Sequence, residues 1–185
     1  MRIIGGKYRG RRINPPQGFR ARPTTDFARE SLFNIIANRI DFEEIEILDL
    51  FAGTGSISYE FASRGAKTVH TIEKDLTNIS FIRKNVSEMR MANIKPVHID
   101  VKTFLKACKY TYDIIFADPP YSLPWIADLP ELIINARILA DGGFLVIEHP
   151  GSIFFSSNSF LFEHRSYGSV NFSFFREDRL KNKKT

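Results

Sequence analysis

The pattern of apolar and polar positions divides most of the chain into short strands and amphipathic helices. From residue 45 onward, five continuous apolar runs have the length of strands, at 45–51, 67–73, 95–99, 112–117 and 142–148. Segments with helical spacing of apolar residues lie between them, at 56–64, 75–91, 102–109 and 126–138. Because the strand-like runs do not alternate between apolar and polar residues, both faces of their sheet must be covered. We therefore predict a doubly wound α/β domain built on a mostly parallel sheet.

The carboxyl-terminal part of the chain has a different pattern. Segments 159–167 and 169–176 are extended and rich in aromatic residues, and only Gly168 separates them. This spacing leaves no room for a crossover helix. The two segments are therefore predicted to form an antiparallel hairpin at one end of the sheet.

The amino-terminal part predicts a second, smaller hairpin in which segments 3–5 and 11–13 pair. The sequence RPTTD at 22–26 then predicts a helix start, with Thr25 or Asp26 as its cap. We accordingly divide the chain into an arm, residues 1–24, and a main domain, residues 25–185.

Composition narrows the class of protein. With 185 residues and 43% hydrophobic content, the chain can bury one full core but not two large ones. The single cysteine, Cys108, cannot form an internal disulfide and reads as a small core residue within helix 102–109. The start of the chain lacks the apolar stretch of a signal peptide, and no run approaches the ~18 apolar residues of a membrane span. We expect a cytoplasmic protein without a membrane partner.

Charge is distributed unevenly, because both ends are basic and the body is acidic. The net charge is +5, and residues 1–22 contain no acid but seven basic side chains: Arg2, Lys7, Arg9, Arg11, Arg12, Arg20 and Arg22. Clustered Arg and Lys side chains bind phosphates regardless of base sequence, and Tyr8 and Phe19 add rings that stack on bases. The arm therefore predicts a nucleic-acid partner, with Lys7, Arg9, Arg11, Arg12 and Arg20 as the contacts.

Carboxylates stand where the ligand of such a sheet is expected. Ligands bind at the carboxyl ends of the strands, and the residues there are Asp49, Glu73, Asp100 and Asp118. After the first strand, DLFAGTGS at 49–56 supplies two glycines for a tight turn, although Ser58 replaces the third glycine of a dinucleotide fingerprint. Glu73 follows at the spacing of a carboxylate that accepts ribose hydroxyls. Asp100 fits equally well as a helix cap.

The charge of these strand ends selects the cofactor. A pyrophosphate, as in NAD or FAD, would be repelled by four acids with no base near them. S-adenosylmethionine carries a sulfonium and an ammonium and has no phosphate, so it suits an acidic rim. The sequence favours this methyl donor.

The stretch DIIFADPPY, residues 113–121, predicts the acceptor of the methyl group. An exocyclic amine on a base is a poor nucleophile, because its lone pair is delocalised into the ring. Asp118 and a main-chain carbonyl of Pro119 or Pro120 can bind its two hydrogens and orient it, and the prolines keep these acceptors rigid. Tyr121 offers a ring on which an extruded base can stack.

With both motifs in place, the chain resembles the amino-group methyltransferases of the S-adenosylmethionine-dependent class I fold. Within them it is similar to the bacterial family that methylates the guanine N2 of small-subunit (16S) ribosomal RNA. The resemblance extends over nearly the whole chain and rests on MRIIGGKYRGRRI, RPTTDFARESLFNII, ILDLFAGTGS, FASRGAKTVHTIEKD, DIIFADPPY and YGSVNFSFFR. The basic opening and RPTTD are the more family-specific parts.

The resemblance implies a seven-stranded sheet of order 3-2-1-4-5-7-6. It implies catalysis at Asp118, Pro119, Pro120 and Tyr121, and donor binding by Asp49, Phe51, Ala52, Gly53, Thr54, Gly55, Glu73, Lys74, Asp100 and Val101, with Arg22 and Thr24 close by. The implied partner is small-subunit ribosomal RNA, either free or in the 30S particle, and we expect a monomer. Tyr59 and Phe61 stand where smaller residues are usual.

Three alternatives stay open on these residues. They are a DNA adenine or cytosine amino methyltransferase, a protein glutamine methyltransferase, and a ribosome-assembly factor that binds RNA without catalysis. Glu148 or His149, at the end of a predicted strand, could line the target pocket. His70, His98 and His164 have no Cys or His at ligand spacing, so we expect no metal.

Overall fold

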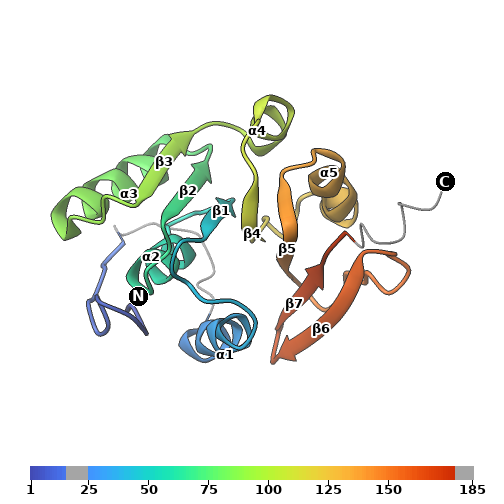
Figure 1. The fold of residues 1–185 in the computed structure, drawn as a ribbon, viewed down its shortest axis with the longest axis horizontal. Helices are drawn as coiled ribbons and strands as arrows, with labels where there is room; N and C mark the ends of the chain where they lie inside the picture. The colour runs from blue at the N-terminus through green and yellow to red at the C-terminus, as the bar shows by residue number, and fades with distance from the viewer. Residues whose placement is uncertain (16–24, 178–185) are drawn as a thin grey trace.

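The computed structural model describes residues 1–15 and 25–177, and within them it contains one seven-stranded sheet of order β3-β2-β1-β4-β5-β7-β6. The strands are β1 (Glu46–Leu50), β2 (Thr68–Glu73), β3 (Ile94–His98), β4 (Tyr112–Ala117), β5 (Leu139–His149), β6 (Leu161–Tyr167) and β7 (Val170–Phe175). Strands β1 to β5 are parallel, whereas β7 is antiparallel to both β5 and β6. Figure 1 shows the β6–β7 hairpin at the edge of the sheet opposite β3. The predicted fold class and strand order are confirmed.

Helices cover both faces of this sheet, as the lack of alternation in the strands requires. The helical elements are α1 (Asp26–Ala37), α2 (Ser56–Ser63), α3 (Leu76–Met89), α4 (Val101–Ala107), the 3-10 turn η1 (Ile126–Asp128) and α5 (Leu129–Asn135). One buried cluster joins α1 and α2 to the sheet, and a second joins α4 and α5 to its other face. Thr25 caps α1, because its Oγ1 accepts from the backbone N–H of Ala28 at 3.2 Å.

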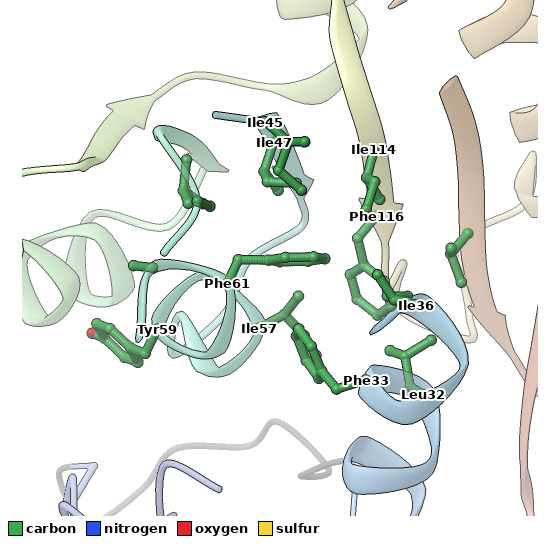
Figure 2. Packing of buried hydrophobic residues seen from close by; sticks show 14 of the residues in the cluster. Leu32, Phe33, Ile36, Ile45, Ile47, Ile57, Tyr59, Phe61, Ile114 and Phe116 are labelled. Atoms are coloured by element: carbon green, nitrogen blue, oxygen red, sulfur yellow. The ribbon is translucent and has the colours of Figure 1, made fainter. Parts of the chain in front are cut away.

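Aromatic packing fixes the first of these clusters (Figure 2). The rings of Phe33 on α1 and Phe61 on α2 meet edge to face, with centroids 4.8 Å apart. The Arg64 guanidinium lies 4.6 Å from the centroid of Phe33. Tyr59 and Phe61, which stand where smaller residues are usual, are both fully buried.

Several boundaries differ from the sequence expectation by one to three residues. Segment 126–138 forms η1 and α5 and ends as a helix at Asn135. Strand β5 begins at Leu139 rather than at Gly142, because a register shift between Tyr112 and Ile114 of β4 absorbs the extra residues. Helix α4 ends at Ala107, so Cys108 is its half-buried cap residue rather than an interior one.

The amino-terminal hairpin is present and fixed to α2, but residues 1–3 rather than 3–5 pair with residues 11–13. Arg2 and Arg12 form an antiparallel bridge, and the side chains of Ile3 and Ile13 belong to the main core. The backbone N–H of Lys7 donates to the Ser63 carbonyl at 2.7 Å. The arm over residues 1–13 is therefore packed on the domain.

Candidate functional site

A cavity of about 530 Å³ opens at the carboxyl ends of the parallel strands, within the size range of small-molecule sites. Twelve of the sequence-predicted site residues line it: Phe51, Ala52, Gly53, Thr54, Glu73, Lys74, Asp100, Val101, Asp118, Pro119, Pro120 and Tyr121. The predicted donor and acceptor motifs therefore share one cavity. Arg22, Thr24 and Arg20 lie outside the described residues.

The glycine loop between β1 and α2 is wound by left-handed residues. Phe51, Gly53 and Gly55 all have positive φ, at 59°, 54° and 80°. A Cβ at Gly55 would lie 3.1 Å from the side chains of Tyr59 and Ile82, so only glycine fits this position without displacing them. Gly55 precedes α2 and does not line the cavity itself.

Glu73 ties this loop to the end of β2. One carboxylate oxygen accepts from the backbone N–H of Gly53 at 2.7 Å, and the other accepts from that of Asp75 at 2.8 Å. Each oxygen of a carboxylate has room for a second donor. Glu73 is thus oriented by the backbone and retains acceptors for a pair of ligand hydroxyls.

Asp49 is close to the cavity but does not line it. Its side chain accepts from the Ser58 hydroxyl at 2.5 Å, and Ser58 also lies 2.7 Å from the Thr71 hydroxyl. Burial raises the pKa of Asp49 to about 7, a rise that the Ser58 hydrogen bonds oppose and the charge of Glu73 reinforces. Asp49 therefore supports the site from behind, through a polar cluster that the sequence pattern did not reveal.

Asp118 begins the segment that follows β4 and faces the same cavity. Its backbone N–H donates to the Leu50 carbonyl at 3.4 Å, which fixes it beside the end of β1. Burial, then the charges of Glu148 and Asp49, raise the pKa of Asp118 well above its ordinary value. Tyr121 is 38% exposed at the cavity wall, so part of its ring is accessible to a ligand.

The two residues at the end of β5 point to opposite faces of the sheet. Glu148 is 3% exposed and lines the cavity. His149 instead makes a 2.8 Å hydrogen bond with Ser173 and packs edge to face on Phe155, on the α5 side. Of the two candidates that the sequence left open, the structure brings only Glu148 to the site.

Asp100 lies both at the start of α4 and in the cavity wall. Its carboxylate accepts from the backbone N–H groups of Lys102 and Thr103, which makes it the cap of α4, and it also lines the cavity. Lys74 and Asp75 are exposed at the rim of the cavity.

The structure also brings Arg29 into the cavity wall, which sequence reasoning missed. Its side chain is 2% exposed, donates to Asp26 at 2.7 Å and lies 3.5 Å from Glu60. The expectation that no base lies near the acids is therefore wrong. Because Arg29 is already paired with two carboxylates, it is not available to bind a phosphate.

The amino-terminal arm reaches this site through Glu60. This buried carboxylate accepts from the backbone N–H groups of Ile4 and Gly5, at 2.5 and 3.3 Å. Met1 lines the cavity, and Lys7, Arg9, Arg11 and Arg12 are exposed on the arm. Four of the predicted phosphate contacts are thus accessible on a segment that is fixed beside the cavity.

Two classes of feature are absent from residues 1–15 and 25–177. No cluster of three or more His, Cys, Asp or Glu side chains there has the arrangement of a metal site. Nor does any helix in these ranges have the length and apolarity to cross a membrane.

Known proteins are similar to this chain in sequence and in fold. The family model described as "Conserved hypothetical protein 95" matches residues 1–176. The chain is 34% identical over 148 residues to "Ribosomal RNA small subunit methyltransferase D" of Escherichia coli (strain K12), covering 80% of this chain and 74% of that protein. It is 33% identical over 153 residues to "Putative rRNA methyltransferase YlbH" of Bacillus subtilis (strain 168), covering 80% and 82%. A solved structure described as "Putative methyltransferase yhhF from Escherichia coli" matches with a TM-score of 0.80 and 30% identity, covering 95% and 96%.

Proposed function

The chain belongs to the family described as "Conserved hypothetical protein 95", and on that premise we propose that it methylates the exocyclic N2 amine of a guanine in small-subunit ribosomal RNA. The methyl donor is S-adenosylmethionine. The observation that carries the proposal is the shared cavity, in which Asp118, Pro119 and Tyr121 face Glu73 and the glycine loop. Relatives named as ribosomal RNA methyltransferases support the substrate class.

The cavity fits the proposed donor in charge and in hydrogen bonding. Glu73, oriented by two backbone N–H groups, holds the ribose hydroxyls. Asp100 and Lys74 line the same part of the wall, and carboxylates around the cavity favour a cationic ligand over a phosphate. When bound, S-adenosylmethionine supplies an electrophilic methyl group on a sulfonium centre.

The residues after β4 orient the amine. Asp118 and a main-chain carbonyl of the Pro119–Pro120 segment accept its two hydrogens, which directs the nitrogen lone pair towards the methyl group. Pro119 is buried and fixed, so these acceptors need little rearrangement. The surplus proton leaves to Asp118 or water after transfer, and the raised pKa of Asp118 suits it to this role. The ring of Tyr121 stacks on the extruded base.

The basic arm supplies the affinity for RNA. Lys7, Arg9, Arg11 and Arg12 contact phosphates, and Arg20 extends the set in the segment outside the described residues. Because residues 1–13 are fixed on α2, these contacts orient the RNA relative to the cavity. The substrate is the free RNA or the assembled 30S particle.

The decisive experiment is mass spectrometry of ribosomal RNA from a strain that lacks the gene. One missing N2-methylguanosine in small-subunit RNA, restored by the wild-type gene and not by Asp118→Ala, is the expected result. Purified Asp118→Ala should lose about 10²–10³-fold in turnover while RNA binding persists. Methyl transfer to DNA or to a protein glutamine in place of RNA would overturn the proposal. RNA binding without any transfer would favour an assembly factor.

A further inference from the structure

Glu148 is a second carboxylate beside the proposed acceptor of the amine. Ala117 of β4 pairs with Ile147 of β5 in parallel register, so Asp118 and Glu148 follow on adjacent strands that lie about 4.8 Å apart. Both line the cavity, and Glu148 is 3% exposed. The backbone of Glu148 is held from the other side by β7, where it pairs with Phe172. Its position is thus fixed by strands on both edges.

Asp118 and Glu148 therefore present two carboxyl groups to the same cavity from adjacent strands. Burial and then the charge of Glu148 raise the pKa of Asp118, as expected for two carboxyls on adjacent strands. Two adjacent ionised carboxylates are stabilised by a ligand that presents two adjacent N–H donors, because hydrogen bonds to the charged form favour it.

Guanine has such an edge. Its N1–H and its N2 amine are neighbours on the Watson–Crick side, whereas adenine and cytosine present a lone pair next to their amine. An ionised carboxylate has only acceptors and repels that lone pair. A flipped base is read by hydrogen bonds to this same edge.

We propose that Glu148 determines the specificity for guanine by accepting the N1–H of the target base while Asp118 accepts its N2 amine. This inference rests on the proposed function and deepens it, since the motif at 118–121 orients an amine on any base. Adenine or cytosine is rejected because its lone pair would face Glu148. Only a protonated or amide side chain at this position would accept such a base.

The test uses small-subunit RNA in which the target guanine, located by the mass spectrometry above, is replaced by 2,6-diaminopurine through ligation of a synthetic segment. Both bases carry the N2 amine, but diaminopurine has a lone pair at N1. Wild-type protein should prefer guanine by about 10- to 100-fold in kcat/KM, the size of one charge-assisted hydrogen bond. In Glu148→Gln the amide donates to N1 of diaminopurine, so the preference should fall to about threefold or less, or reverse.

Two controls separate recognition from folding. Glu88→Gln, on the exposed face of α3, should leave the base preference unchanged. Glu148→Ala offers neither acceptor nor donor, so it should lower guanine turnover. Because it also removes the repelling carboxylate, it should bring the two substrates closer in kcat/KM without favouring diaminopurine. The ratio of the two substrates is measured within one preparation, so a loss of folded protein does not alter it.

The outcomes are distinct. A folded Glu148→Gln variant that keeps the wild-type ratio would overturn the role of Glu148 and leave the proposed function intact. The same conclusion follows if wild-type protein methylates both bases equally, a measurement that needs no variant. If wild-type protein transfers no methyl group to guanine in any small-subunit RNA, the proposed function fails, and the specificity role fails with it.

Discussion

The hydroxyl of Ser58 donates a 2.5 Å hydrogen bond to the carboxylate of Asp49, so the residue that replaces a glycine of the dinucleotide fingerprint binds the acid at the end of β1. The same hydroxyl contacts Thr71 of β2. Helix α2 is thus joined to β1 and β2 by a buried polar cluster directly behind the glycine loop.

Removing this hydroxyl should destabilise the protein. Ser58→Ala removes the hydroxyl that Asp49 and Thr71 share but keeps the backbone hydrogen bond of residue 58 to Asp49, and we expect a loss of about 1–3 kcal/mol in the free energy of unfolding. Ser87→Ala, at an exposed position of α3, should change it by less than about 0.5 kcal/mol. Urea unfolding of both variants measures the difference, and equal losses would contradict a structural role for the cluster.

The titration of Asp49 should appear in the pH dependence of stability. Its pKa of about 7 in the folded protein exceeds the ordinary value of 3.8, so the folded state binds the proton more tightly. The contribution of Asp49 to the free energy of unfolding therefore falls as the pH rises from about 4 to about 7.

Asp49→Asn removes that titration. The free energy of unfolding of the variant minus that of the wild type should increase across this pH window, by up to about 4 kcal/mol. The raised pKa of Asp118 acts in the same direction in both proteins and largely cancels. Urea titrations at several pH values test this, and a difference that is constant with pH would count against the raised pKa.

The crossing of the arm over α2 depends on Gly6. A Cβ at Gly6 would lie 1.9 Å from the Ser63 carbonyl oxygen, whereas a Cβ at Gly10 meets nothing within 4 Å. Both glycines have positive φ, so Gly10→Ala is a matched control for backbone strain of about 1–2 kcal/mol. Gly6→Ala should lose more than this and release the protected amide of Lys7, which hydrogen exchange detects. Similar losses in the two variants would mean that the contact with α2 is unimportant.

Stacking on Tyr121 should depend on the ring. Tyr121→Ala should lower kcat/KM for RNA by about 10- to 100-fold, the effect of one base–aromatic stack, while Tyr121→Phe should stay within a few fold of wild type. Tyr110→Ala, which removes another exposed tyrosine, serves as the control. Methyl-transfer kinetics check this, and an inactive Tyr121→Phe would indicate that the hydroxyl and not the ring matters.

The arm should govern the salt dependence of RNA binding. Changing Arg9, Arg11 and Arg12 together to Gln should weaken binding at low salt and reduce the slope of log K against log salt by about 0.7–0.9 for each phosphate that the variant no longer binds. The pair Arg83→Gln and Lys106→Gln, on α3 and α4, should leave the slope unchanged. Filter binding across a salt series measures it, and an unaltered slope in the triple variant would exclude the arm as the phosphate site.

The sequence predicted the sheet because its strands carry a strong local signal, and the strand order came from the resemblance. It also brought the glycine loop and the segment at 118–121 to one edge, since carboxyl ends of parallel strands meet there. The polar cluster of Ser58 and Thr71 was not predictable, because its partners are distant in sequence and each looks like an ordinary helix or strand residue. Arg29 was missed for the same reason: its position in the cavity wall depends on how α1 packs.

The side of the sheet that Glu148 faces could not be predicted from the sequence pattern alone. Adjacent residues of a strand face opposite sides, so one of Glu148 and His149 had to face the site. Which of the two does so depends on the register of β5. That register is set by the irregularity opposite Tyr112 and Ile114, which no local pattern indicates. The boundaries of β5 and of α5 were misplaced in the same region.

Strand β7 is buried along its whole length and covers the edge of β5 that carries Glu148. A ribosome delivers the chain from its amino end, so β5 presents an unpaired apolar edge until the residues up to Phe175 have emerged. Until then the open edge of β5 can pair with the open edges of other nascent chains on the same messenger RNA. The wall beside Asp118 is therefore completed last, and a truncated translation product ending before β7 would retain the glycine loop but lack a properly held Glu148.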